Sequence, residues 1–182
     1  MIGGVDAVLI REKSLTSARL LALAARLRQM TSTYKARLII HSQADIAAAV
    51  GADGVHLSSA EMTSVAAVRQ WLREPEMSVS VSCHNADELA LAYEMGADYA
   101  MLSPLFPTHS HPGAAHLGLE VFDELVSNAK LPIIALGGIR PENCALLQGR
   151  SLAVIGAILA ADDAKHAALQ LFEAASKRIE ES

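Results

Sequence analysis

The sequence has no run of basic residues, no long apolar segment and few aromatic side chains. Its 182 residues carry a formal net charge of −5, and Phe, Trp and Tyr together make up only 4% of them. This acidic balance argues against a surface for nucleic acid or anionic lipid. No apolar stretch reaches the roughly 20 residues that a membrane-spanning helix needs. We therefore expect neither a nucleic acid nor a membrane as a partner.

Cysteine is also scarce, and the familiar local motifs of catalysis are missing. Cys83 and Cys144 are the only two cysteines, too few for a disulfide framework and without metal-ligand spacing. We expect both to be buried thiols of a protein in the reducing cytoplasm. The amino terminus lacks the charged and apolar regions of a signal peptide. No P-loop, GxGxxG, HExxH or Ser-His-Asp pattern occurs.

The sequence does contain short apolar segments that alternate with stretches of helical periodicity. Such alternation predicts a parallel sheet with right-handed crossovers, either doubly wound or closed into a barrel. Asn85 with Glu88 predicts a capping box at the start of one helix. The expected strands cover residues 6–10, 37–41, 54–57, 78–82, 99–102, 132–136 and 152–156.

A local echo favours the barrel. Gly-x-Asp precedes three of the strands, at residues 4–6, 51–53 and 96–98. The second and third glycines should end helices in the left-handed conformation, but no helix precedes the first. We expect an α/β fold, a TIM (β/α)8-type barrel lacking its first βα unit, forming a single domain over residues 1–182. A start-site artefact with the same fold is the alternative. The terminal helix or a partner chain would cover the sheet edge, and a homodimer is left open.

Two small-residue turns follow the last two expected strands. In folds of this kind ligands bind at the carboxyl ends of the strands. Gly137-Gly138 lets backbone amides approach a ligand closely, and Gly156-Ala157 does the same at a helix start. Together they resemble the phosphate site of barrel enzymes. Two tight turns without a ligand are the alternative.

Cationic and imidazole side chains follow other expected strands. Arg11 and Lys13 could hold a second anionic group, although such residues can also be surface charges. Histidines could serve as acids, bases or anion donors, and we expect one or two of them to be functional. Six of the seven histidines lie at or after strands, at positions 41, 56, 84, 109, 111 and 116.

The order and spacing of five segments resemble the thiamine phosphate synthase and TenI-like thiazole tautomerase family. The segments are VLIREK at 8–13, DIAAAVGADGVHL at 45–57, SVSCH at 80–84, PLFPT at 104–108 and ALGGI at 135–139. The resemblance covers nearly the whole chain and begins at the family's second strand. It implies a barrel that handles the thiazole phosphate precursor of thiamine.

The synthase of this family joins thiazole phosphate to hydroxymethylpyrimidine pyrophosphate with Mg²⁺ and releases pyrophosphate. The tautomerase isomerises the thiazole phosphate. The resemblance places Arg11 and Lys13 at the pyrophosphate and Ser82 near the reacting centre. On the thiazole phosphate side it places Thr108, Ser110, Gly137, Gly138, Gly156 and Ala157.

The chain departs from the family at several of these positions. The Asn-Asp pair of the synthase is His41-Ser42 here, so one Mg²⁺ ligand is lost, and the second falls at or beside Glu61. The loss of a carboxylate predicts weak Mg²⁺ binding. We still count His41 among the anion-binding residues. The lysine that assists the leaving pyrophosphate is His111, and the tautomerase's own histidine falls on Pro104.

Three hypotheses remain open, and in each the partner is a small phosphorylated metabolite. The first is a synthase-like transferase, in which Ser82 acts at the reacting centre and His84 or His111 moves protons. The second is a tautomerase-like isomerase that needs no metal. The third is a relative that binds a phosphorylated metabolite without catalysis or with a regulatory role. We favour an enzyme over the third.

Overall fold

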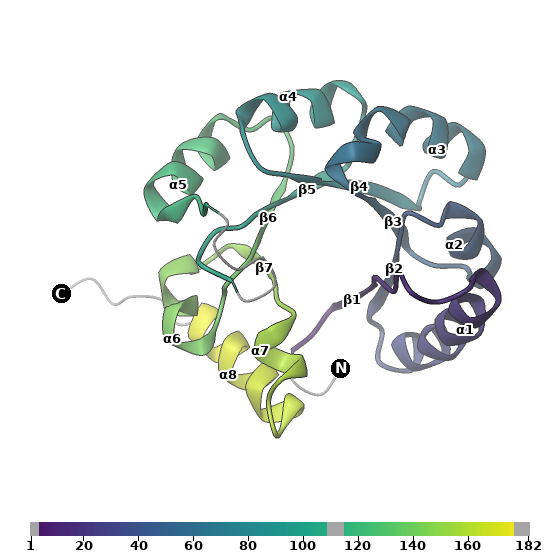
Figure 1. Cartoon of the computed structure of the whole chain (residues 1–182). Helices are drawn as coiled ribbons and strands as arrows, with labels where there is room; N and C mark the ends of the chain where they lie inside the picture. Colours follow the sequence, from purple (N-terminus) through teal and green to yellow (C-terminus); the bar gives the residue numbers. More distant parts are fainter. Residues whose placement is uncertain (1–3, 109–114, 177–182) are drawn as a thin grey trace. The chain divides into compact units, whose positions relative to one another are not determined.

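The computed structural model describes residues 4–108 and 115–176, in which seven strands alternate with helices (Figure 1). The strands lie side by side in chain order, β1 to β7, in one sheet. They are β1 (Ala7–Ile10), β2 (Arg37–His41), β3 (Gly54–Leu57), β4 (Ser78–Cys83), β5 (Tyr99–Leu102), β6 (Ile133–Leu136) and β7 (Ser151–Ala153).

Helices connect these strands. They are α1 (Ser17–Thr33), α2 (Ala44–Val50), α3 (Val65–Leu72), α4 (Ala86–Glu94), α5 (Gly118–Asn128), α6 (Pro141–Cys144), α7 (Gly156–Leu159) and α8 (Ala164–Ser176), with short 3-10 helices η1 (Ser59–Ser64) and η2 (Ala145–Leu147). Seven sequential strands with intervening helices are the connectivity predicted for a TIM-type fold of seven units. Among the described residues, no helix is both long and apolar enough to span a bilayer.

The last expected strand is the one whose position was wrong. The apolar run at 152–156 predicted a strand, but β7 covers Ser151–Ala153 and Gly156 is the first residue of α7. Ile155 between them has φ −125° and ψ −74°, outside the strand region. A short apolar run does not distinguish the end of a strand from the first turn of a helix, so the pattern could not place this boundary.

The chain forms two compact units. The first consists of Asp6–Ala100 with Lys130–Pro132, and the second of residues 4–5, Met101–Ala129 and 133–176. The division falls within β5. In the first unit β1, β2, β3 and β4 pair in parallel, with His41 opposite His56 and His56 opposite Ser80. In the second unit β6 pairs in parallel with β7.

The Gly-x-Asp echo has a structural meaning in the first unit. Gly51 ends α2 in the left-handed conformation, as predicted, and Gly96 after α4 has φ +80°. Each following aspartate binds the start of a strand: Asp53 Oδ2 accepts the Leu38 amide at 2.7 Å, and Asp98 Oδ2 accepts the Val79 amide at 2.6 Å.

An arginine from a neighbouring helix completes each of these contacts. Arg28 of α1 pairs with Asp53 at 2.5 Å, and Arg69 of α3 pairs with Asp98 at 2.6 Å. We call the two arrangements the aspartate clamps, defined by Asp53 with Arg28 and Asp98 with Arg69. Both clamps fix the amino ends of strands, β2 and β4.

In the second unit, the terminal helix packs against the amino-terminal segment. Gly4 has φ +76°, and a Cβ added there would lie 2.6 Å from a ring atom of Phe172 on α8. Helix α8 also packs on α6 and α7. The contact joins Gly4, ahead of β1, to α8, and covering of the sheet edge by the terminal helix stays a prediction.

Candidate anion-binding site

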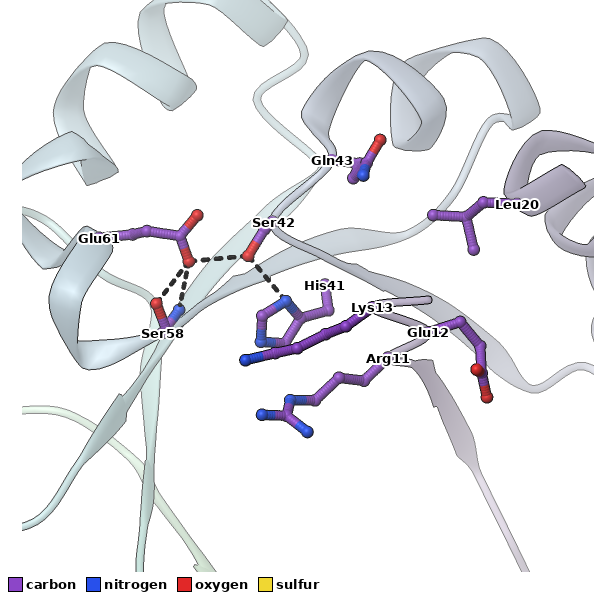
Figure 2. A pocket seen from close by; sticks show the side chains of 9 residues that line it. All are labelled: Arg11, Glu12, Lys13, Leu20, His41, Ser42, Gln43, Ser58 and Glu61. Carbon is purple, nitrogen blue, oxygen red and sulfur yellow. Dashed lines mark hydrogen bonds between the residues drawn. The ribbon is translucent and has the colours of Figure 1, made fainter. Parts of the chain in front are cut away.

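A pocket of about 360 Å³ opens at the carboxyl ends of the first three strands, within the first unit. Arg11 and Lys13 follow β1, His41 ends β2, and Glu61 lies in η1 after β3. Parallel strands in register bring these ends to one edge of the sheet. The lining residues are Arg11, Glu12, Lys13, Leu20, His41, Ser42, Gln43, Ser58 and Glu61 (Figure 2).

Two cations reach into this pocket. Figure 2 shows the side chains of Arg11 and Lys13 extending in the same direction, beside the ring of His41. Within the described part of the chain, neither cation takes part in a salt bridge. Glu12, between them in sequence, points away from the other charged groups (Figure 2). The two positive charges are therefore available to an anionic ligand.

Glu61 is fixed at the opposite side of the pocket. Its Oε2 accepts the Ser58 amide at 2.9 Å, the Ser58 hydroxyl at 2.6 Å and the Ser42 hydroxyl at 2.7 Å. Ser58 and Glu61 form a capping box that starts η1. Burial raises the pKa of Glu61, but the hydrogen bonds from Ser58 and Ser42 outweigh it, so the pKa lies below its usual value. The carboxylate is thus ionised and held in place.

The hydrogen bonds also determine the tautomer of His41. A serine hydroxyl has one proton to donate, and Ser42 donates it to Glu61. The contact of 2.7 Å between Ser42 Oγ and His41 Nδ1 must then have the ring donating. Burial, and next the positive charge of Arg11, lower the pKa of His41. The ring is therefore neutral near pH 7, with the lone pair on Nε2.

The pocket is poor in the donors that Mg²⁺ favours. Mg²⁺ prefers carboxylate oxygens in octahedral geometry, whereas Oε2 of Glu61 already accepts three hydrogen bonds, which leaves Oε1, and Ser42 offers only a hydroxyl. The remaining charged groups that reach into the pocket are the cations Arg11 and Lys13. Among the described residues, no group of three or more His, Cys, Asp or Glu side chains is placed to hold a metal ion.

A buried polar network lies beside the pocket, on β3 and β4. His56 is 3% exposed and Ser80 is fully buried. His56 Nδ1 lies 2.9 Å from Ser80 Oγ, and its Nε2 lies 2.9 Å from Ser82 Oγ. Ser80 Oγ donates to the Val55 carbonyl at 3.4 Å, so His56 Nδ1 donates to Ser80 and Nε2 accepts from Ser82. Burial lowers the pKa of His56 to about 4, with a further contribution from His41.

This network positions Ser82, the residue that the resemblance places near the reacting centre. His56 was expected among the histidines at or after strands, without a connection to Ser82. The signal was present in the alternation of Ser78, Ser80 and Ser82 with valines, because residues two apart share one face of a strand. A histidine at the matching register of the neighbouring strand completes the polar row.

His84 has a capping environment at the start of α4. Its backbone amide and its Nδ1 both contact Glu88 Oε2, at 2.8 and 2.9 Å. Asn85 accepts the Glu88 amide at 2.9 Å, which is one half of the predicted capping box. In a capping box the Glu88 carboxylate would accept the backbone amide of Asn85. Here it accepts the backbone amide of His84 instead. His84 is exposed, and its predicted catalytic role stays a prediction.

In the second unit, the Gly137-Gly138 turn is packed against the loop after β5. Gly137 has φ +101°, and a Cβ there would lie 2.7 Å from Pro104 Cα. A Cβ on Gly138, φ +66°, would lie 2.4 Å from the Pro107 carbonyl oxygen. Leu105 and Phe106 donate backbone hydrogen bonds to Leu136 and Gly137. Close packing of this loop therefore requires the two glycines, whether or not a ligand binds.

The second turn lies on the same sheet edge. Leu136 is paired with Ala153, so the residues after β6 and after β7 emerge side by side. Gly156 and Ala157 open α7, and nothing lies within 4 Å of a Cβ added at Gly156. Thr108 is half-buried in the loop after β5. The predicted residues Ser110 and His111 lie outside the described residues.

These observations define a parallel α/β protein of the TIM-barrel type, with a cationic pocket after β1 to β3 and a glycine-lined turn pair after β6 and β7. The sequence matches the family described as thiamine monophosphate synthase over residues 1–160. The chain therefore belongs to the thiamine monophosphate synthase family.

Named relatives agree with this assignment. A thiamine-phosphate synthase of Methanococcus vannielii is 33% identical over 180 residues, which cover 97% of this chain and 86% of the relative. The thiamine-phosphate synthase of Archaeoglobus fulgidus is 37% identical over 175 residues, covering 93% and 80%. A solved structure of thiamine phosphate pyrophosphorylase from Pyrococcus furiosus superposes with a TM-score of 0.85 at 31% identity, covering 95% of this chain and 84% of the other. The predicted family and fold class are confirmed.

Proposed function

We propose that this chain is a transferase of the thiamine-phosphate synthase type, acting on two small phosphorylated precursors in the cytoplasm. In the reaction, the bond between hydroxymethylpyrimidine and pyrophosphate breaks and a bond to thiazole phosphate forms. Membership of the family over residues 1–160 carries the proposal. The cationic pocket and the turn pair each supply one feature that such substrates need.

The pyrophosphate of the pyrimidine precursor would bind in the cationic pocket. Arg11 can donate two parallel hydrogen bonds to phosphoryl oxygens, and Lys13 adds a compact positive charge. Ser82, oriented by His56 at 2.9 Å, has lone pairs that remain available to a reacting group. Positive charge at the departing pyrophosphate lowers the barrier to its departure, because negative charge develops there as the bond breaks.

The phosphate of the thiazole precursor would bind at the turn pair of the second unit. Gly137 and Gly138 are half-buried at the carboxyl end of β6, against the loop after β5, and the first amides of α7 have no helical partners of their own. Backbone amides of this kind bind phosphate oxygens without a side-chain charge. Thr108 and Ser110 would complete this side, as the family resemblance implies.

A coupling assay with purified protein tests the proposal. Both precursors are supplied, and formation of thiamine phosphate and pyrophosphate is followed with Mg²⁺ and with EDTA. We expect product that depends on both precursors, and a strongly reduced rate in Ser82→Ala. Absence of product both with Mg²⁺ and with EDTA, together with no thermal stabilisation by either precursor, would reject the proposed transferase function.

A tautomerase-type isomerase is the second candidate, and the state of His41 favours it. A neutral imidazole with its free Nε2 in a pocket is suited to accept a proton from carbon, and that reaction needs no metal. The test follows deuterium exchange at the thiazole carbon of thiazole phosphate by NMR. Exchange that His41→Gln abolishes and Arg26→Ala retains would support the isomerase, whereas exchange unchanged in His41→Gln would exclude His41 as the base.

A further inference from the structure

We propose that the pocket after β1 to β3 binds a pyrophosphate group without a divalent cation, using Arg11 and Lys13 with His41 beside them. This inference rests on the proposed function, because it concerns the precursor that carries pyrophosphate. It also departs from the Mg²⁺ use that the family resemblance implies, so it describes a property of this chain and not of its relatives.

The first argument is the engagement of Glu61. Oε2 of Glu61 accepts two hydroxyl protons and one amide proton, which leaves only Oε1 of this carboxylate to offer a metal. These bonds belong to the start of η1 and to Ser42, so they are part of the local fold. Bidentate ligation by Glu61 would require Oε2 to give up these bonds, which would break the capping box and remove the acceptor of two serine hydroxyls.

The second argument is the replacement of the neighbouring donor. Ser42 occupies the position of the family's metal-binding aspartate, and its hydroxyl donates to Glu61. A serine hydroxyl is neutral, so it cannot supply the negative charge with which an aspartate would bind a metal ion. Its backbone φ is +59°, a conformation that aspartate and asparagine tolerate better than most residues. The backbone conformation at position 42 would therefore accept the family's aspartate, and it does not explain why serine is present.

The third argument is the charge that remains. Arg11 and Lys13 point into the pocket without a salt-bridge partner among the described residues. Directly bound cations neutralise phosphoryl oxygens as a metal would, and arginine does so in a bidentate geometry. His41, held by its contact with Ser42, directs Nε2 toward the same space (Figure 2).

The experiment is calorimetric titration of the purified full chain with inorganic pyrophosphate, once in EDTA and once with millimolar Mg²⁺. We expect binding in EDTA with an affinity that Mg²⁺ does not increase. Arg11→Ala and Lys13→Ala should each weaken it about tenfold or more, whereas Arg26→Ala, which removes an exposed cation of α1, should not. Binding that requires Mg²⁺, or no binding in either condition, overturns the inference.

A reverse experiment restores the family's pair of side chains. The double variant His41→Asn with Ser42→Asp should bind pyrophosphate more weakly than wild type in EDTA and recover affinity when Mg²⁺ is added. The same dependence on Mg²⁺ in wild type and variant would contradict the inference. If the variant does not fold, as circular dichroism would show, the wild-type and single-variant titrations still decide.

The outcomes also separate this inference from the proposed function. Metal-independent pyrophosphate binding without coupling activity keeps the inference and removes the transferase. Coupling activity that is lost in EDTA keeps the transferase and removes the inference.

Discussion

His56 is buried, neutral and hydrogen-bonded at both ring nitrogens, and this affects stability in acid. Its pKa is about 4 in the folded chain and about 6.5 in the unfolded chain. Between these values the unfolded chain binds more protons, so the free energy of unfolding decreases as the pH falls from 6.5 to 4. This loss in the free energy of unfolding reaches about 3 kcal/mol at pH 4 and below.

Denaturant titrations from pH 7.5 to 4 measure this effect, compared with His56→Asn. Other groups also titrate in this range, so the difference between the two curves is the quantity of interest. We expect the wild-type curve to fall more steeply than that of the variant between pH 6.5 and 4. Parallel curves would mean that His56 is not held neutral.

His41 predicts that ligand affinity increases as the pH falls, whereas His56 predicts that stability decreases. Burial and Arg11 lower its pKa in the free protein, whereas a bound polyanion would favour the charged imidazolium. Binding then takes up a proton, so pyrophosphate affinity should increase as the pH falls through the neutral range. Titrations in buffers of different ionisation enthalpy measure this uptake. His41→Gln should remove it, and since the ligand's own protonation is common to both proteins, an equal uptake would contradict the role.

The glycines at 96 and 138 offer a matched pair of variants. Both have positive φ, but a Cβ on Gly138 would meet the Pro107 carbonyl oxygen at 2.4 Å, while nothing lies within 4 Å at Gly96. Gly96→Ala should cost roughly 1–2 kcal/mol through backbone strain alone. Gly138→Ala should cost about 1–3 kcal/mol more through overpacking. Chemical denaturation of both variants checks the order, and equal losses would show that the loop moves aside easily.

At the scale of elements, the aspartate clamps predict two unequal losses of stability. Asp53→Asn removes the charge that pairs with Arg28, and Asp98→Asn does the same for Arg69. We expect about 1–2 kcal/mol for Asp53→Asn and less for Asp98→Asn, because the second pair is more exposed, 35% and 43% against 20% and 38%. Glu94→Gln, an exposed charge on α4, serves as the control in urea titrations and should change little. A larger loss for Asp98→Asn would contradict this order.

Most strands, and the glycine that ends α2, could be predicted because they depend on local pattern. The end of β7 could not be predicted, because the apolar run continues into α7 with no polar residue to mark the boundary. The clamps and the His56 network could not either, since they join residues such as Arg28 and Asp53 that are far apart in sequence. Their partners become visible only when the register of the strands is known.

The same distinction applies to the candidate site. The motif at Arg11 and Lys13 predicted a cationic strand end, and the structure places both residues in one pocket with His41 and Glu61. The direction of each hydrogen bond was not predictable, because it depends on a chain of donors that runs from His41 through Ser42 to Glu61. The catalytic and binding roles of these residues stay predictions.

At the scale of the whole molecule, the two cysteines report on opening of the fold. Cys83 belongs to the first unit and Cys144 to the second, and both are free and buried. Burial raises the pKa of Cys83 to about 12 and also raises that of Cys144. We expect neither thiol to react with a soluble disulfide reagent in the native protein at pH 8, and both to react in denaturant. Fast labelling of the folded chain would contradict their burial.

Single-cysteine variants, Cys83→Ser and Cys144→Ser, turn this into a measurement for each unit. The labelling rate of the remaining thiol in low denaturant reports how often its own unit opens. Similar rates for the two variants are expected if the units open together, and different rates would assign a separate stability to each.

The aspartate clamps have one more consequence, for how this fold can change. They anchor β2 and β4 where these strands begin, whereas His41 and Ser82 sit where the same strands finish. The part of each strand that secures the architecture is thus separate from the part that meets a ligand. Substitutions at the finishing ends can exchange one chemistry for another while the architecture survives, which makes this edge a suitable place for engineering new specificity.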